Sequence, residues 1–201
     1  MLQIYLIRHG QTKWNLLKKM QGSKDSKLTD QGIKQAIMLG KKLKPVKFNK
    51  IYSSSATRTM ETSGFIFPSM EVCYSTSLNE IAMGEWEGRT YTQIEKMNPK
   101  EWHNFFNDPF NYNPSKGGES FAKLKNRLKQ FIYTERLFSQ EGNIAIVSHR
   151  ITLRMLLSIL LEEKELFSEI DLSPTSLSVI EIDDNTCKVK YLNNISHYCD
   201  A

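Results

Sequence analysis

The stretch Gln3-Ile4-Tyr5-Leu6-Ile7-Arg8-His9-Gly10 decides the fold that we expect for this chain. It begins with an apolar run rich in isoleucine, which predicts a β-strand that ends on an arginine and a histidine. In an open α/β sheet, ligands bind beyond the carboxyl ends of the strands. Arg8 and His9 are therefore placed for chemistry, although this stretch alone would fit an ordinary surface strand end about equally well.

A second stretch of the same form favours the chemical interpretation. Residues 143–147 (NIAIV) are another short apolar run, which ends in Ser148-His149-Arg150. The chain has four histidines, and two of them follow its two most strand-like runs, each beside an arginine. Packing explains such a pair poorly, because arginine is seldom buried without a partner. We expect both strand ends to contribute to one site.

Arg58 is expected to be a third cation at the same edge of the sheet. Residues 50–53 predict a brief strand, and the serines that follow at 54 and 55 can cap the next helix. Arg58 then lies in the first turn of that helix, near a strand end. The alternative is a weak surface pair of Arg58 with Glu61, which would not require this location.

An inserted lid is expected over the site at about residues 82–120. Residues 82–121 hold eight of the 21 aromatic residues. Most of them would form the lid's own core, and one or two would face a ligand. The remaining expected elements are a short helix within 15–20, a helix from Asp30 to before Pro45, a strand at 71–74, helices at 121–132 and 151–161, and a hairpin of 176–182 and 186–192 around Asp183-Asp184-Asn185.

This order of elements predicts an α/β fold: a three-layer α/β/α sandwich with a mostly parallel central sheet and the small helical and loop lid. A length of 201 residues with 40% hydrophobic content suits a single domain over residues 1–201. The sequence contains no apolar run of membrane-spanning length and does not begin like a signal peptide, so we expect a cytoplasmic protein with no membrane partner. Cys73, Cys187 and Cys199 show no disulfide or zinc-binding spacing, and we expect them to stay reduced.

The basic charge is concentrated in the first third of the chain. Residues 1–60 contain 13 Lys or Arg and only two acidic residues. A positive field of this kind attracts a small phosphorylated substrate. Nucleic acid is the rival partner, but Lys34, Lys41 and Lys42 fit the solvated outer face of one helix, so we expect no nucleic-acid binding. Pattern alone does not distinguish an exposed edge strand from a dimer interface, and a homodimer stays open.

The expected cluster of arginines and histidines suits a phosphoryl group. The planar guanidinium matches phosphate oxygens, and a histidine among such groups can act as a nucleophile or as a cationic stabiliser. Thr12 and Asn15 add neutral hydrogen-bonding groups, and Gly10 would let the backbone approach a ligand. A zinc site of His9, His149 and Glu80 is the competitor, but neighbouring arginines would repel a divalent cation. We therefore expect no metal and no other cofactor.

Arg8-His9-Gly10 with Thr12 and Asn15 resembles the R-H-G-[EQ]-T-x-x-N signature of the histidine phosphatase (phosphoglycerate mutase-like) superfamily. The resemblance continues through LTDQG, YSSSATRTMET, LNEIAMGEWEG, GGES and VSHR, in the family's order and over most of the chain.

The resemblance implies a metal-independent phosphomonoesterase that acts on a small phosphorylated metabolite through a phosphohistidine on His9. Glu80 would protonate the leaving oxygen and then activate water, and the motif selects it over Glu85 and Glu87, which spacing alone would allow. Arg8, Arg58 and His149 would hold the phosphoryl oxygens, assisted by Asn15. The full set of expected substrate-binding residues is Arg8, Thr12, Asn15, Gln21, Arg58, Glu80, His149 and Arg150.

The sequence departs from many relatives at Ser148-His149-Arg150-Ile151, where they have Ser-His-Gly-Gly. Arg150 would either add a substrate-facing cation or point to solvent. Phosphoglycerate mutase-type transfer and a catalytically silent phospholigand-binding protein remain the alternative functions, and the short chain favours the phosphatase. His197 is a further substrate-site candidate, and a surface tail histidine is its alternative. The sequence does not name the substrate.

Overall fold

The computed structural model describes residues 1–163, 166–183 and 186–199, and their strands form one sheet of order β3-β2-β4-β1-β5-β6. The neighbours β3-β2, β2-β4 and β4-β1 are parallel, and β1-β5 and β5-β6 are antiparallel. The predicted mostly parallel sheet is confirmed. The strands are β1 (Leu2–Arg8), β2 (Phe48–Ser54), β3 (Cys73–Ser75), β4 (Gly142–Ser148), β5 (Leu177–Asp183) and β6 (Thr186–Asn194).

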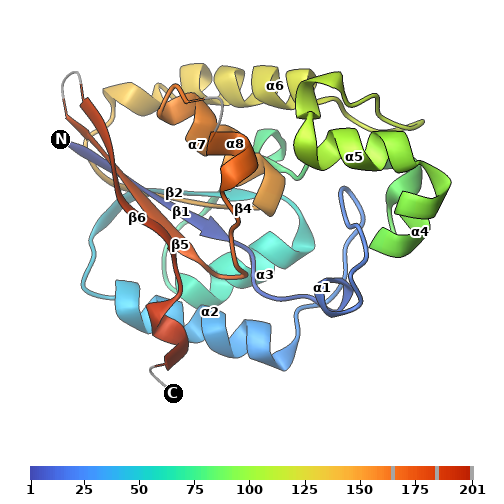
Figure 1. The fold of residues 1–201 in the computed structure, drawn as a ribbon. Coiled ribbons are helices and arrows are strands. Elements are labelled where there is room, and N and C mark those ends of the chain that lie inside the picture. Colours follow the sequence, from blue (N-terminus) through green and yellow to red (C-terminus); the bar gives the residue numbers. More distant parts are fainter. Residues whose placement is uncertain (164–165, 184–185, 200–201) are drawn as a thin grey trace.

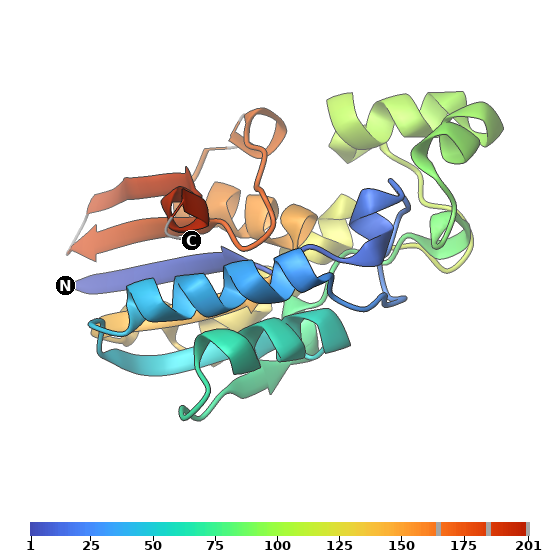
Figure 2. The same ribbon diagram turned by 90° about the horizontal axis from the view of Figure 1, so that it is seen from below.

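Helices cover both faces of the sheet, as the predicted three-layer sandwich requires. In Figure 1, α2 (Asp30–Leu43) and α3 (Thr57–Ile66) lie below the sheet, whereas α6 (Phe121–Thr134) and α7 (Arg150–Leu160) lie above it, and Figure 2 shows α2 and α3 side by side from below. The short α8 (Leu166–Glu169) packs against α7. The antiparallel hairpin β5-β6 is also confirmed, but its expected turn residues Asp184 and Asn185 lie outside the described residues.

The alternation of side chains along β1 divides the core into two layers. Leu2, Ile4 and Leu6 belong to the cluster that includes α6 and α7, whereas Ile7 packs with Leu39 of α2. Successive strand residues point to opposite faces, so a strand covered on both sides is apolar along most of its length. Burying each such side chain stabilises the fold by about 1.5–3 kcal/mol.

Side chains at the N-cap positions explain where α2 and α6 begin, but not where α3 begins. The Thr29 hydroxyl accepts a hydrogen bond from the Gly32 backbone and begins α2, and Ser120 begins α6 in the same way. The predicted serine cap of α3 is wrong, because the N-cap residue is Ala56, whose side chain cannot accept a hydrogen bond. Ser54 instead turns its hydroxyl toward the site described below.

The lid lies beyond the carboxyl ends of the parallel strands, beside α1 (Lys13–Leu16). It contains α4 (Tyr91–Met97) and α5 (Pro99–Asn107), seen at the right of Figure 1. Most lid aromatics pack on one another as expected, with Trp86 buried between Phe105 and Tyr112. The α1 helix begins and ends earlier than the helix predicted within 15–20. Among the described helices, none has the length and apolar character needed to cross a membrane.

Candidate active site

His9 and His149 lie side by side because their strands are neighbours in register. Arg8 at the end of β1 pairs with Ser148 at the end of β4, so the next residue of each strand is a histidine at the same level. The His9 backbone nitrogen donates to the Ser148 carbonyl at 2.9 Å. The two ring centroids are 5.3 Å apart and both side chains are buried. The expected meeting of the two strand ends is confirmed.

The His9 ring is held in one orientation by its own backbone. Nδ1 lies 2.8 Å from the Gly10 carbonyl, and because a carbonyl only accepts, Nδ1 carries the proton. Burial, followed by the charges of Arg58 and Arg8, holds the pKa of His9 well below its usual 6.5. The ring is therefore neutral near pH 7, with a free electron pair on Nε2.

The His149 ring is fixed in the opposite way. Its Nδ1 accepts a hydrogen bond of 3.2 Å from Nε of Arg58, so its proton is on Nε2. Nε2 donates to the Ser54 hydroxyl at 2.7 Å, and Ser54 donates to Oδ1 of Asn79 at 2.7 Å. Burial, and then Arg58 and His9, lower the pKa of His149 as well. The hydrogen bonds thus form a row from Arg58 through His149 and Ser54 to Asn79, in which each donor has a defined acceptor.

Arg58 is buried, and each of its three nitrogens makes at least one hydrogen bond. It lies in the first turn of α3, as the sequence predicted, but the alternative pair with Glu61 is wrong. Its Nη1 contacts Asp25 Oδ1 at 2.5 Å and the Lys24 carbonyl at 3.0 Å, and its Nη2 donates to the Gly22 carbonyl at 2.9 Å. The loop after α1 thus wraps around the outer side of the guanidinium.

Arg8 approaches the same space from β1. Its Nη1 donates to the Leu172 carbonyl at 2.5 Å, and its Nε has no hydrogen-bond partner within the described residues. Burial, with a further contribution from Arg150, lowers the pKa of Arg8 to about 10. Arg8 therefore remains charged at neutral pH and has a donor to offer to an anion.

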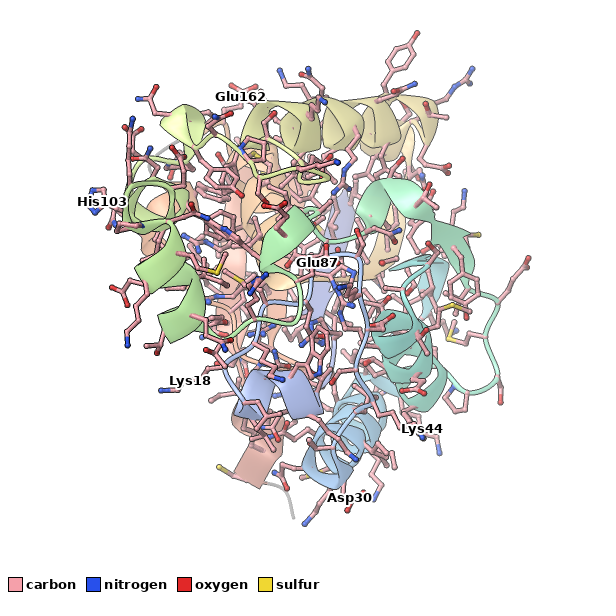
Figure 3. All side chains as sticks on the ribbon, turned by 90° about the vertical axis from the view of Figure 1, so that its right-hand side faces the viewer. Lys18, Asp30, Lys44, Glu87, His103 and Glu162 are labelled. Carbon is pink, nitrogen blue, oxygen red and sulfur yellow. The ribbon has the colours of Figure 1, made fainter. Side chains whose placement is uncertain are left out.

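Glu80 alone among the three neighbouring glutamates faces the pocket. Its Oε1 accepts from the backbone nitrogens of Ile81 and Thr152 at 3.0 Å, and its Oε2 accepts from Ile151 at 3.1 Å. Glu85 is exposed. Glu87, near the middle of Figure 3, instead accepts backbone hydrogen bonds from residues 23, 24 and 83 and so ties the loop after α1 to the lid.

These groups surround one pocket under the lid. Its empty volume, counting space open to solvent, is about 470 Å³. Nine residues were assigned to catalysis or substrate binding from the sequence, and seven of them line this pocket. Thr12 and His149 do not. The pocket is lined by Arg8, His9, Asn15, Lys19, Met20, Gln21, Gly22, Arg58, Glu80, Met83, Tyr91, Phe105, Phe106, Arg150 and Ile151.

Thr12 lies behind the pocket wall. Its hydroxyl caps α1 by accepting from the Asn15 backbone at 3.2 Å and also accepts from Nε2 of Gln21 at 2.6 Å. Thr12 therefore orients two lining residues. Gly10 also has a role within the fold, because a Cβ there would lie 3.0 Å from the Gly32 carbonyl oxygen. Its lack of a side chain allows this loop to approach α2 closely.

The sequence interpretation missed several lining residues. Lys19 was counted only within the basic first third, and the lid contributes three aromatic side chains, Tyr91, Phe105 and Phe106, where one or two were expected. Aromatic content indicated a lid, but helical spacing within short helices did not tell which rings turn inward.

The other two histidines lie outside the pocket. His103 is exposed at the outer edge of the lid, as Figure 3 shows. His197 is buried, with Nε2 3.4 Å from the Thr175 hydroxyl, and it does not line the pocket. The expectation of a surface tail histidine is therefore wrong, and His197 is not among the residues that line this pocket. Among the described residues, no group of three His, Cys, Asp or Glu side chains is arranged to hold a metal ion.

Comparison with known proteins places these features in a family context. A family model described as the histidine phosphatase superfamily (branch 1) matches residues 4–195. The chain is 33% identical over 165 residues to a probable phosphoglycerate mutase GpmB of Proteus mirabilis, covering 80% of this chain and 75% of that protein.

Two solved structures extend the likeness to nearly the full length. Bacillus stearothermophilus YhfR has a TM-score of 0.89 and 32% identity, covering 98% of this chain and 100% of its own. A phosphoserine phosphatase mutant of Entamoeba histolytica, solved in complex with phosphoserine, has a TM-score of 0.86 and 28% identity, covering 98% of this chain and 99% of its own. That amoebic phosphatase has also been solved with 3-phosphoglyceric acid.

Proposed function

Because this chain belongs to branch 1 of the histidine phosphatase superfamily and is a phosphatase of small phosphorylated metabolites, we propose that it hydrolyses phosphomonoesters through a phosphohistidine on His9. The observation that carries this proposal is the placement of His9 and His149 at the ends of neighbouring strands, with ring centroids 5.3 Å apart, beside Arg8, Arg58 and Glu80. We further propose that residues 1–201 act as one domain.

His9 is the proposed nucleophile. Its Nε2 electron pair is available because Nδ1 donates to the Gly10 carbonyl and the low pKa keeps the ring neutral. Nε2 attacks phosphorus and forms the N–P bond while the bond between phosphorus and the leaving oxygen breaks. The Nδ1 hydrogen bond then stabilises the positive charge of the phosphorylated ring.

Arg8 and Arg58 are the proposed stabilisers of the phosphoryl oxygens. Arg58 is buried and Arg8 is half-buried, and in such a site of low dielectric fixed charges act strongly on charge that develops during transfer. His149 orients Arg58 through the hydrogen bond that its Nδ1 accepts from Arg58 Nε. Asn15 and Gln21 complete the wall, with Thr12 behind them.

Glu80 is the proposed acid and base. Backbone N–H groups fix the carboxyl group at the start of α7. Two of them donate to Oε1, and one donates to Oε2. In the first step Glu80 gives its proton to the leaving oxygen. In the second step it takes a proton from water, which attacks phosphorus, breaks the N–P bond and releases inorganic phosphate. The enzyme then returns to its starting protonation state.

The experiment that tests this function is hydrolysis of an aryl phosphate in excess chelator, measured for the wild-type chain and for His9→Ala. We expect turnover that survives the chelator, is lost in His9→Ala, and is accompanied by an acid-labile phosphoenzyme. His103→Ala serves as a control, because that histidine is exposed outside the pocket. Retained turnover in His9→Ala would contradict the proposal, and loss of turnover in chelator would favour a metal site.

A mutase is the second candidate, because a probable phosphoglycerate mutase is among the relatives. It differs in the acceptor of the phosphoryl group, which is a second hydroxyl rather than water. Release of inorganic phosphate in proportion to phosphoenzyme decay supports the phosphatase, and transfer to an added phosphoglycerate supports the mutase. Binding of phospholigands without either reaction would identify a catalytically silent protein.

A further inference from the structure

The pocket carries more positive charge than a phosphoryl group needs. Its lining contains four cationic side chains and one carboxylate, Glu80. Two of the cations, Arg8 and Arg58, lie beside His9, where the phosphoryl group is proposed to bind. The other two, Lys19 and Arg150, come from different elements, the loop after α1 and the first turn of α7.

Arg150 is a cation at the rim of the pocket with donors to spare. Its side chain is 29% exposed, whereas Arg58 is 1% exposed. It donates from Nε to Oδ1 of Asp171 at 2.7 Å, and within the described residues no hydrogen bond uses its two terminal nitrogens. Asp171 is 73% exposed, so this ion pair is largely solvated and weak. An incoming anion can therefore engage Arg150 at little cost.

Lys19 contributes a second cation without an acidic partner in the described part of the chain. It is half-buried, and its ammonium lies 6.0 Å from the centre of the Trp14 ring. The backbone of the same loop bridges to the lid, where Lys19 pairs with Thr90 and Tyr91 donates to the Lys18 carbonyl at 3.0 Å. This anchoring holds the lysine at the pocket rather than on a free loop.

We propose that Lys19 and Arg150 form a second anionic subsite, which binds a carboxylate on the leaving group of the substrate. The substrates are then phosphomonoesters of small hydroxy or amino acids. This inference rests on the proposed function, because the first subsite must hold the phosphoryl group. Carboxylate is favoured over a second phosphate because Arg150 already binds one carboxylate in this structure, that of Asp171.

The test uses two substrates that differ only in a carboxylate, O-phosphoserine and O-phosphoethanolamine. We expect the wild-type chain to prefer O-phosphoserine in kcat/KM, and Arg150→Gln and Lys19→Gln each to reduce that preference by about tenfold or more. Hydrolysis of O-phosphoethanolamine should change little in both variants. Neither substitution removes a buried group, so both variants are expected to fold.

Two exposed residues outside the pocket provide matched controls, Arg89→Gln for Arg150 and Lys13→Gln for Lys19. Both should keep the wild-type preference. A second substrate pair, fructose 1,6-bisphosphate and fructose 6-phosphate, reports a phosphate-specific subsite. If Arg150→Gln changes the selectivity within this pair but not within the serine pair, the carboxylate proposal is overturned.

The failure of this inference is distinguishable from that of the proposed function. Turnover of an aryl phosphate without any preference for O-phosphoserine, or a preference that survives in both variants, overturns the carboxylate subsite and leaves the phosphatase in place. If the wild-type chain does not hydrolyse an aryl phosphate at all, the proposed function itself is contradicted.

Discussion

The guanidinium Nε of Arg58 donates a hydrogen bond of 3.2 Å to Nδ1 of His149, and this bond determines the protonation of the row behind the pocket. Since Nδ1 accepts, His149 must carry its proton on Nε2. Nε2 then donates to the Ser54 hydroxyl, and Ser54 donates to Asn79. A protonated His149 would lose this bond and place a second charge against Arg58. The row therefore requires a neutral ring.

Ser54→Ala tests the importance of this row for stability. The Ser54 hydroxyl is fully buried and accepts from His149 while donating to Asn79. Alanine therefore leaves the buried Nε2 of His149 without an acceptor, whereas Oδ1 of Asn79 keeps its hydrogen bonds from Ser55. We expect the free energy of unfolding to fall by about 1–3 kcal/mol and kcat to fall as well, because His149 would no longer be held against Arg58. Chemical denaturation and steady-state kinetics measure the two effects. Unchanged stability would mean that water replaces the hydroxyl.

Glu80→Gln tests the assignment of the acid. A glutamine keeps one oxygen for the backbone donors of Ile81 and Thr152 but places an amide where Oε2 accepts from Ile151. It has no proton to transfer at neutral pH. We expect formation of the phosphoenzyme from an alkyl phosphate to fall by about 10²–10⁴-fold, and its formation from an aryl phosphate to fall much less, because a phenolate leaves without protonation. Hydrolysis of the phosphoenzyme, for which Glu80 is the base, should fall equally for both substrates. Glu85→Gln, on an exposed residue, should leave both rates unchanged. Equal losses in the rate of phosphoenzyme formation from the two substrates would argue that Glu80 has a structural role.

The strand ends and the order of elements were predictable from the sequence because they depend on short-range patterns. Apolar runs ending in Arg8-His9 and Ser148-His149 predict strands, and parallel pairing then brings the two ends to one edge of the sheet. The lid was predictable in the same way from the aromatic content of residues 82–120.

The directions of individual side chains were not predictable. Thr12 was expected to bind substrate, but its hydroxyl bonds within its own loop. His149 was expected to contact the phosphoryl group, yet Arg58 and Ser54 occupy both of its nitrogens in this structure. Lys19 was missed because nothing in the sequence of this basic segment indicates that its loop pairs with the lid at Thr90. Each of these outcomes depends on contacts between segments far apart in the chain.

Gly32→Ala tests the close approach between the first loop and α2. A Cβ at Gly32 would lie 2.4 Å from the Gln11 carbonyl oxygen and 2.8 Å from its backbone nitrogen, so the backbone that follows His9 would have to move. We expect a loss of about 1–3 kcal/mol in the free energy of unfolding, together with lower turnover. Gly64→Ala in α3 is the matched control, because a Cβ there meets nothing within 4 Å. It should stabilise the protein by about 0.5–1 kcal/mol.

The low pKa values of His9 and His149 predict how stability changes with pH. Burial and the neighbouring arginines keep both rings neutral in the folded chain, whereas in the unfolded chain they titrate near 6.5. Above pH 6.5 both states are neutral and the two histidines contribute no pH dependence. As the pH falls below 6.5, the unfolded chain takes up protons that the folded chain does not, so the free energy of unfolding decreases toward the folded-state pKa values.

Denaturant titrations at steps from about pH 7.5 to about pH 5 measure this slope, and His9→Asn isolates the share of one ring. The variant should lose less stability over this range than the wild-type chain, because asparagine does not titrate. Aryl phosphate turnover should also persist below pH 6.5, since Nε2 of His9 keeps its electron pair there. A wild-type chain that gained stability on acidification through this range would show that the rings are protonated in the fold, and the neutral nucleophile would have to be abandoned.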